Sequence, residues 1–176
     1  MYIIIGLRTI VKFSYDHIFH LIVGVNTMII VADFTNPEVL PMIVKEINVS
    51  GIDVGALVNN VGLLGPHYMS FLELDNETVK NMINVNVLAA TVLCHAILPD
   101  MKKKGRGAII NISSAVEQCV APYLAVYSAT KHYMSAFTQA IAAEYSNCGV
   151  TIQCVEPGEV STEMTKLFIR KVLVIT

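Results

Sequence analysis

Charged residues are scarce in this chain of 176 residues, where they make up 15% of the sequence. An average soluble domain carries about 25%. The 12 Lys and Arg residues do not outnumber the 14 Asp and Glu residues, so there is no basic excess that would indicate a nucleic-acid partner. A hydrophobic content of 54% excludes intrinsic disorder. The length suits one domain with a sizeable core.

Long hydrophobic runs are also lacking. A membrane-spanning helix needs about 20 consecutive apolar residues. The window 17–32 contains no Asp, Glu, Lys or Arg but is only 16 residues long, and the window 54–72 is interrupted by Asn, Gly and Pro. No basic segment precedes the apolar opening of the chain, as one would in a secretory signal. Neither window predicts a membrane span.

The four cysteines do not form a metal-binding or disulfide pattern. Cys94, Cys119, Cys148 and Cys154 include no C-x-x-C pair, and none has histidines at zinc spacing. We therefore interpret them as small hydrophobic residues in a reduced compartment, and we expect no metal site.

Short, continuous apolar runs alternate with helical patterns along the chain. Such runs are typical of strands buried on both faces, as in parallel sheets covered by helices. The expected strands are 27–33, 56–60, 108–113 and 150–156, and the expected helical regions are 37–48, 75–98 (as two helices) and 123–147. This alternation predicts an α/β fold with a mostly parallel sheet.

Tyr127 and Lys131 form the most informative motif. They lie four residues apart in an expected helix, so their side chains share one face. A nearby ammonium group stabilises phenolate, so Lys131 would lower the pKa of Tyr127 and make it a general acid or base for a carbonyl or alcohol. On its own, this spacing is better explained by an ordinary amphipathic pair.

Further polar residues and glycines follow the expected strands. Ser114 ends the third strand, where its hydroxyl could bind a substrate oxygen, and Gly62 after the second strand allows close approach of a ligand. Asn86 lies inside a helical segment with no local reason for an Asn. Most of these positions fall at strand carboxyl ends, where open α/β sheets bind ligands.

Together these residues resemble the short-chain dehydrogenase/reductase family, in the family's own order. The family's N-N-A-G is similar to Asn59-Asn60-Val61-Gly62, and its P-G-x-V-x-T is similar to Pro157–Thr162. The remaining matches are Asp33 for the aspartate that borders adenine, Asn86 for the catalytic asparagine, Ser114 for the serine, and Tyr127 with Lys131 for Y-x-x-x-K. Within the family, these motifs look closest to those of the very-long-chain 3-oxoacyl-CoA reductases and 17-beta-hydroxysteroid dehydrogenases.

The resemblance implies a Rossmann-like, doubly wound parallel sheet and hydride transfer between NADP and the carbonyl or hydroxyl of a steroid or acyl-CoA-like substrate, with NAD also open. Tyr127 would move the proton, Ser114 would hold the oxygen, Lys131 would bind the nicotinamide ribose, and Asn86 would hold a water. The cofactor-binding residues implied are Asp33, Asn60, Gly62, Tyr127, Lys131, Pro157, Val160 and Thr162.

Two parts of the family fold are not recognisable in this sequence, namely the first βαβ unit with its glycine-rich loop and the last strand, so the expected sheet is incomplete. The glycine-rich loop that binds pyrophosphate has no counterpart, because Gly6 and Gly24 are the only glycines before Gly51. The expected division is an unassigned apolar segment 1–26, a partial catalytic domain 27–165 and an unassigned tail 166–176, as in a chain truncated at both ends. Residues 1–10 or 19–25 could supply a replacement strand, since both contain β-prone runs.

Three readings of function follow from the sequence. The first is the oxidoreductase, which the family resemblance would place at the endoplasmic reticulum membrane, and otherwise in the cytoplasm. The second is a catalytically inactive partner of a full-length relative or of another copy, pairing through helices that contain Ala89, Ala90, Ala136, Ala140 and Ala143. The third is a protein held at a membrane surface by its apolar N-terminus.

Overall fold

A computed structural model describes residues 2–5, 30–66 and 68–158 of the chain. The strands are β1 (Tyr2–Ile5), β2 (Ala56–Asn59), β3 (Gly107–Ile112) and β4 (Val150–Val155), and the helices are α2 (Val39–Val49), α3 (Asn76–Ile83), α4 (Ala89–Lys104) and α5 (Ala125–Glu144). A π-helical turn, Asn84–Leu88, joins α3 to α4, and short 3-10 turns lie at Phe71–Glu73 and Ala115–Gln118.

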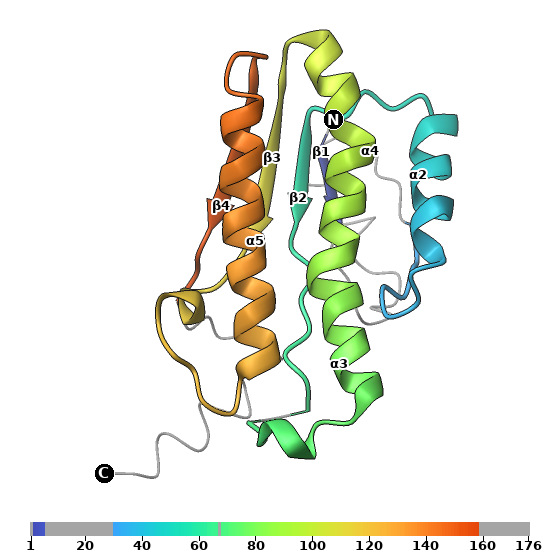
Figure 1. Ribbon diagram of the computed structural model, residues 1–176. Coiled ribbons are helices and arrows are strands. Elements are labelled where there is room, and N and C mark those ends of the chain that lie inside the picture. The colour runs from blue at the N-terminus through green and yellow to red at the C-terminus, as the bar shows by residue number, and fades with distance from the viewer. Residues whose placement is uncertain (1, 6–29, 67, 159–176) are drawn as a thin grey trace, which may run out of the picture.

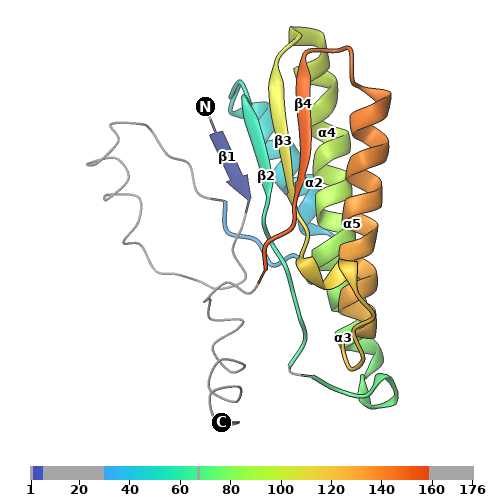
Figure 2. The same ribbon diagram turned by 90° about the vertical axis from the view of Figure 1, so that its left-hand side faces the viewer.

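The described strands form a single parallel sheet in the order β1-β2-β3-β4 (Figure 2). The register places Leu57, Ile109 and Ile152 side by side across three strands, and Asn59, Asn111 and Cys154 side by side two residues later. Leu57 and Ile109 are fully buried. The predicted α/β fold with a parallel sheet is confirmed, as are the strands expected at 56–60, 108–113 and 150–156.

Helices α2, α4 and α5 cover one face of this sheet (Figures 1 and 2). In α2 the buried residues Leu40, Ile43 and Ile47 recur at helical spacing, which is why this segment packs as an amphipathic helix. α4 presents its largest buried side chains, Leu93, Ile97 and Met101, in the same way. The carboxyl ends of the strands all meet at the edge where α5 begins, which positions the candidate site.

The strand expected at 27–33 is wrong for its described part, because residues 30–33 form no strand. Asp33 instead opens a turn: its carboxylate accepts hydrogen bonds from the Thr35 backbone N–H (3.0 Å) and hydroxyl (2.8 Å), and the chain then enters α2. The edge of β2 is occupied by β1, which pairs with it from Tyr2↔Ala56 to Ile5↔Asn59. Residues 2–5, within the expected 1–10, therefore supply the replacement strand, while 6–10, 19–25 and 27–29 lie outside the described residues.

The region expected as two helices at 75–98 is one continuous run from Asn76 to Lys104 with a π-helical turn inside it. Asp75 caps its start by accepting from the Thr78 N–H (2.7 Å), and Gly105 ends it with φ of 66°, the left-handed conformation that favours glycine. This run is long and apolar enough to cross a membrane, because an 18-residue window within it has a mean hydropathy of 1.7. Half of that window, however, is buried inside the fold. Such burial is also found for an apolar helix in the core of a protein.

Candidate functional site

Ser114, Tyr127 and Lys131 meet at the carboxyl end of β3. Ser114 follows this strand, Tyr127 lies in the first turn of α5, and Lys131 lies one turn further along the helix. The Ser114 hydroxyl lies close enough to Tyr127 to lower the pKa of its phenol. The Lys131 Nζ lies over the Tyr127 ring, 5.7 Å from its centroid, and donates to the Ile112 carbonyl at 2.9 Å. The structure thus brings together the three residues that the sequence motif had proposed.

The direction of the Tyr127 pKa differs from the sequence prediction. Burial raises the pKa of Tyr127, and the Ser114 hydroxyl only partly opposes that rise. The net lowering expected from Lys131 is wrong for this arrangement, because burial has the larger effect on the pKa of the phenol. An unassisted Tyr127 therefore holds its proton at neutral pH.

Lys131 is buried, with 4% of its surface exposed. Burial lowers the pKa of Lys131 from 10.5 to about 8, and the charges of Cys154 and Glu117 oppose that shift. An ammonium group this deep in the protein costs stability, and such a cost is typical of residues retained for chemistry.

Asn86 lies at the centre of the π-helical turn and is 3% exposed. Its Oδ1 accepts from the Leu63 N–H (2.7 Å), and its Nδ2 donates to the Leu63 carbonyl (2.9 Å) and the Thr130 hydroxyl (2.9 Å). The side chain therefore ties the loop after β2 to α5, beside Lys131. Both N–H groups of its amide are used in these bonds, so the Asn86 side chain holds the loop after β2 and α5 together.

The residues expected to bind cofactor are only partly gathered at this edge. A methyl group placed on Gly62 would lie 3.6 Å from the Lys131 Nζ and 3.9 Å from the Asn86 Oδ1, so the backbone of Gly62 approaches both. Asn60 is exposed directly after β2. The Pro157 carbonyl accepts from the Ala115 N–H at 3.0 Å, which joins the segment after β4 to the turn after Ser114.

Three other expectations concern the cofactor and its surroundings. Asp33 is exposed and its carboxylate closes the turn before α2. Val160 and Thr162 lie outside the described residues. Among the described residues no cluster of three His, Cys, Asp or Glu side chains could hold a metal ion.

Sequence reasoning missed several residues that surround the site. The Ser113 hydroxyl contacts both the Glu117 carboxylate and the Lys131 carbonyl, the latter at 2.9 Å. Glu117 could have been noticed as a lone carboxylate three residues after the candidate Ser114. A second set, Asn59 and Asn111 joined at 2.7 Å with Thr138 on α5 at 2.9 Å from Asn111, ties the sheet to the helix that carries Tyr127.

This arrangement is suited to proton transfer at an oxygen atom. A phenol on a rigid helix lies beside a serine hydroxyl, and a buried amine lies one helical turn away. Because the positions of these groups are set by α5, β3 and the π-helical turn, little rearrangement is needed when a substrate oxygen arrives.

Comparison with known proteins identifies the same family as the sequence motifs indicate. The family model described as short chain dehydrogenase matches residues 16–172. The chain is 39% identical over 141 residues to the human inactive hydroxysteroid dehydrogenase-like protein 1, which covers 80% of this chain and 42% of that protein. It is 37% identical to zebrafish (Danio rerio) 17-beta-hydroxysteroid dehydrogenase type 3 over 81% of this chain and 47% of that one.

A very-long-chain 3-oxoacyl-CoA reductase from Rattus norvegicus is 39% identical over 82% of this chain and 46% of its own length. Among solved structures, a short-chain dehydrogenase from Sphingobium yanoikuyae in complex with NADPH matches with a TM-score of 0.78 and 28% identity, over 85% of this chain and 57% of that one. The chain spans less than half the length of these curated relatives. Family model, relatives and fold agree: this chain belongs to the short-chain dehydrogenase family and is similar to its 3-oxoacyl-CoA reductase and 17-beta-hydroxysteroid dehydrogenase members.

Proposed function

We propose that this protein is an NADP(H)-dependent oxidoreductase that transfers hydride between nicotinamide and the carbonyl or hydroxyl of a steroid or 3-oxoacyl substrate of lipid metabolism. The observation that carries the proposal is the meeting of Ser114, Tyr127 and the buried Lys131 at the carboxyl edge of a parallel sheet. The reductases and hydroxysteroid dehydrogenases among its relatives support the substrate class.

In the proposed reduction, Tyr127 donates its proton to the substrate oxygen as negative charge develops there, and Ser114 donates a hydrogen bond to the same oxygen. The raised pKa of Tyr127 suits this role, since the phenol arrives protonated. The Lys131 ammonium stabilises the phenolate that remains. Asn86 keeps the loop after β2 and α5 in register, so that these groups stay aligned.

The residues at this edge fit the nicotinamide half of the cofactor. The backbone of Gly62 approaches the amine of Lys131, which places a polar group beside backbone that has no side chain, as binding of a ribose requires. We assign Lys131, Tyr127, Gly62 and Pro157 to this half, Asp33 and Asn60 to the adenine side, and Val160 with Thr162 to the carboxamide. When bound, the cofactor supplies the hydride. The absence of a glycine-rich motif before Gly51 makes the pyrophosphate contact the weakest part of the fit.

Cofactor binding tests this proposal directly. NADPH at 100 times its dissociation constant should stabilise the folded chain by about 2.7 kcal/mol, which raises the melting temperature by roughly 5–10 °C. The measurement is a thermal denaturation series over increasing NADPH, with NADH in parallel to compare the two cofactors. No shift at millimolar concentrations of either cofactor would overturn the proposal for this chain.

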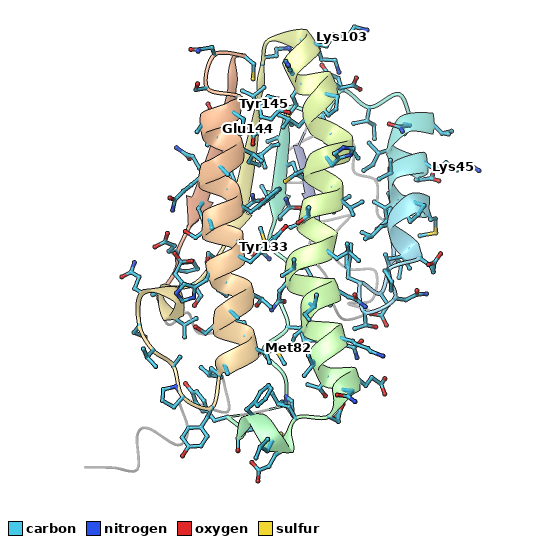
Figure 3. The ribbon with its side chains drawn as sticks, in the orientation of Figure 1. Lys45, Met82, Lys103, Tyr133, Glu144 and Tyr145 are labelled. Atoms are coloured by element: carbon cyan, nitrogen blue, oxygen red, sulfur yellow. The ribbon has the colours of Figure 1, made fainter. Side chains whose placement is uncertain are left out.

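A second candidate function is that of an inactive partner of another copy or of a full-length relative. It is favoured by the missing glycine-rich motif and by the exposed small residues Ala136, Ala140 and Ala143 on α5. Ala89 and Ala90 are buried within this chain, so they are not part of the expected pairing surface. Tyr133 lies on this surface of α5 (Figure 3), where its hydroxyl is 3.0 Å from that of Thr91. Analytical ultracentrifugation without cofactor would distinguish a stable pair from a monomer.

Attachment to the endoplasmic reticulum membrane is part of the same proposal, and it rests on similarity to the reductase and hydroxysteroid dehydrogenase members. Flotation of the purified chain with neutral liposomes tests the membrane contact separately from the chemistry. Recovery of the protein only in the dense fraction would contradict it.

A further inference from the structure

We propose that Glu117 is a positioning residue for Lys131: its carboxylate, held by the Ser113 hydroxyl, supplies the negative charge that keeps the buried amine in its charged form. The inference rests on the proposed function, because it concerns the amine of the same site. Glu117 lies in the 3-10 turn that follows Ser114, so one short segment carries both the serine of the site and this carboxylate.

The geometry links the two residues through Ser113. The hydroxyl of Ser113 donates to the Glu117 carboxylate and lies 2.9 Å from the backbone carbonyl of Lys131. Ser113 is 2% exposed, and its own N–H donates to the Val155 carbonyl at 2.8 Å. Because both ends of Ser113 are anchored, the carboxylate is held at a constant place relative to α5, next to the turn that contains Lys131.

The other titratable groups around Lys131 do not supply a lasting negative charge. Tyr127 on its own helix stays protonated because burial raises its pKa. A charge on Cys154 of β4 would oppose the shift more than that of Glu117, but burial and the neighbouring Glu117 and Glu156 raise the pKa of this thiol above its ordinary value of 9.0, so it is uncharged at neutral pH. From the loop after β2 and the π-helical turn, the groups that approach are Gly62 and Asn86, which are neutral.

The charge of Glu117 matters because burial works against the ammonium. Burial lowers the pKa of Lys131 to about 8, and the Glu117 charge is one of two influences that hold it from falling further. Without that charge, a large share of Lys131 would be neutral at pH 7–8. A neutral amine would no longer stabilise the Tyr127 phenolate during turnover.

The test is the titration of Lys131 itself in the full chain without cofactor. Lysines are labelled with carbon-13, and the chemical shift of the Lys131 Cε is followed from pH 6 to pH 10, its signal being assigned by its loss in Lys131→Arg. We expect a midpoint near 8 in the unchanged chain. Glu117→Gln keeps the size of the side chain and an oxygen acceptor for Ser113, and should lower the midpoint by roughly one pH unit.

Two further variants separate charge from structure. Glu117→Asp retains the carboxylate and should bring the midpoint back toward that of the unchanged chain. Glu144→Gln removes an exposed carboxylate at the far end of α5 and should leave the midpoint unchanged. An equal midpoint in Glu117→Gln and the unchanged chain, in a variant that folds normally, would overturn the inference. Failure to bind NADPH would instead contradict the proposed function, because this titration contains no cofactor.

Discussion

Turnover is expected to fall by roughly 10²- to 10⁴-fold when Tyr127 is replaced by Phe, which is the usual contribution of a positioned general acid or base. The substitution removes one oxygen atom and keeps the ring that packs beneath the Lys131 amine. Because the ring remains, NADPH binding and thermal stability should change little. Steady-state rates with a 3-oxoacyl-CoA and a 17-ketosteroid, measured beside the NADPH titration, separate lost chemistry from lost binding.

Tyr145→Phe is the matched control for this substitution. Tyr145 follows the last residue of α5 and stacks under the Lys102 amine, 5.3 Å from its ring centroid, at the end of the helix remote from Ser114. Its hydroxyl should be dispensable for turnover. If Tyr127→Phe retained the rate of the unchanged chain while turnover was measurable, Tyr127 would have no role in proton transfer.

Replacing Lys131 with Met should stabilise the protein at neutral pH, and this gain should disappear at high pH. Since burial lowers the pKa of Lys131 from 10.5 to about 8, the unfolded chain binds the proton more tightly than the folded one. The free-energy cost of burying the charged Lys131 is therefore about 3 kcal/mol. This cost is fully present below pH 8 and is lost as the pH rises toward 10.5. Relative to the unchanged chain, the variant should lose about 2 kcal/mol of its advantage between pH 6.5 and pH 9.5.

Urea denaturation at pH 6.5, 8 and 9.5 measures this difference. Taking the difference between variant and unchanged chain removes the contributions of Tyr127, Cys94 and Cys154, whose raised pKa values act in the opposite direction over the same range. Lys45→Met is the control, because Lys45 is exposed on α2 (Figure 3). A Lys131→Met difference that did not change with pH would show that burial does not lower the pKa of Lys131.

The amino-acid order alone was enough to predict most of the sheet. Continuous apolar runs such as Ala56–Asn59 and Val150–Val155 can be buried in a parallel strand, and the helical spacing of Leu40, Ile43 and Ile47 defines the covering helix. The pairing of Tyr127 with Lys131 also follows from local periodicity, because residues four apart on a helix share a face.

Strand selection at the edge of the sheet was decided by tertiary structure. Residues 2–5 and 27–33 are both apolar enough for a strand, so propensity cannot choose between them. The choice depends on hydrogen bonding to β2, which β1 provides, and on the turn that Asp33 imposes before α2. Long-range pairing of this kind has no local signature in the sequence.

The electrostatics of the site were also decided by tertiary structure. The order of residues is enough to predict which polar groups meet at the carboxyl edge, namely a phenol, an amine and a serine hydroxyl. Only the folded chain decided that burial outweighs the Lys131 charge at Tyr127, and that Glu117 comes to face Lys131 through Ser113. The physical reason is that pKa values depend on burial and on neighbours distant in sequence, and both exist only once α5 packs against β3 and β4.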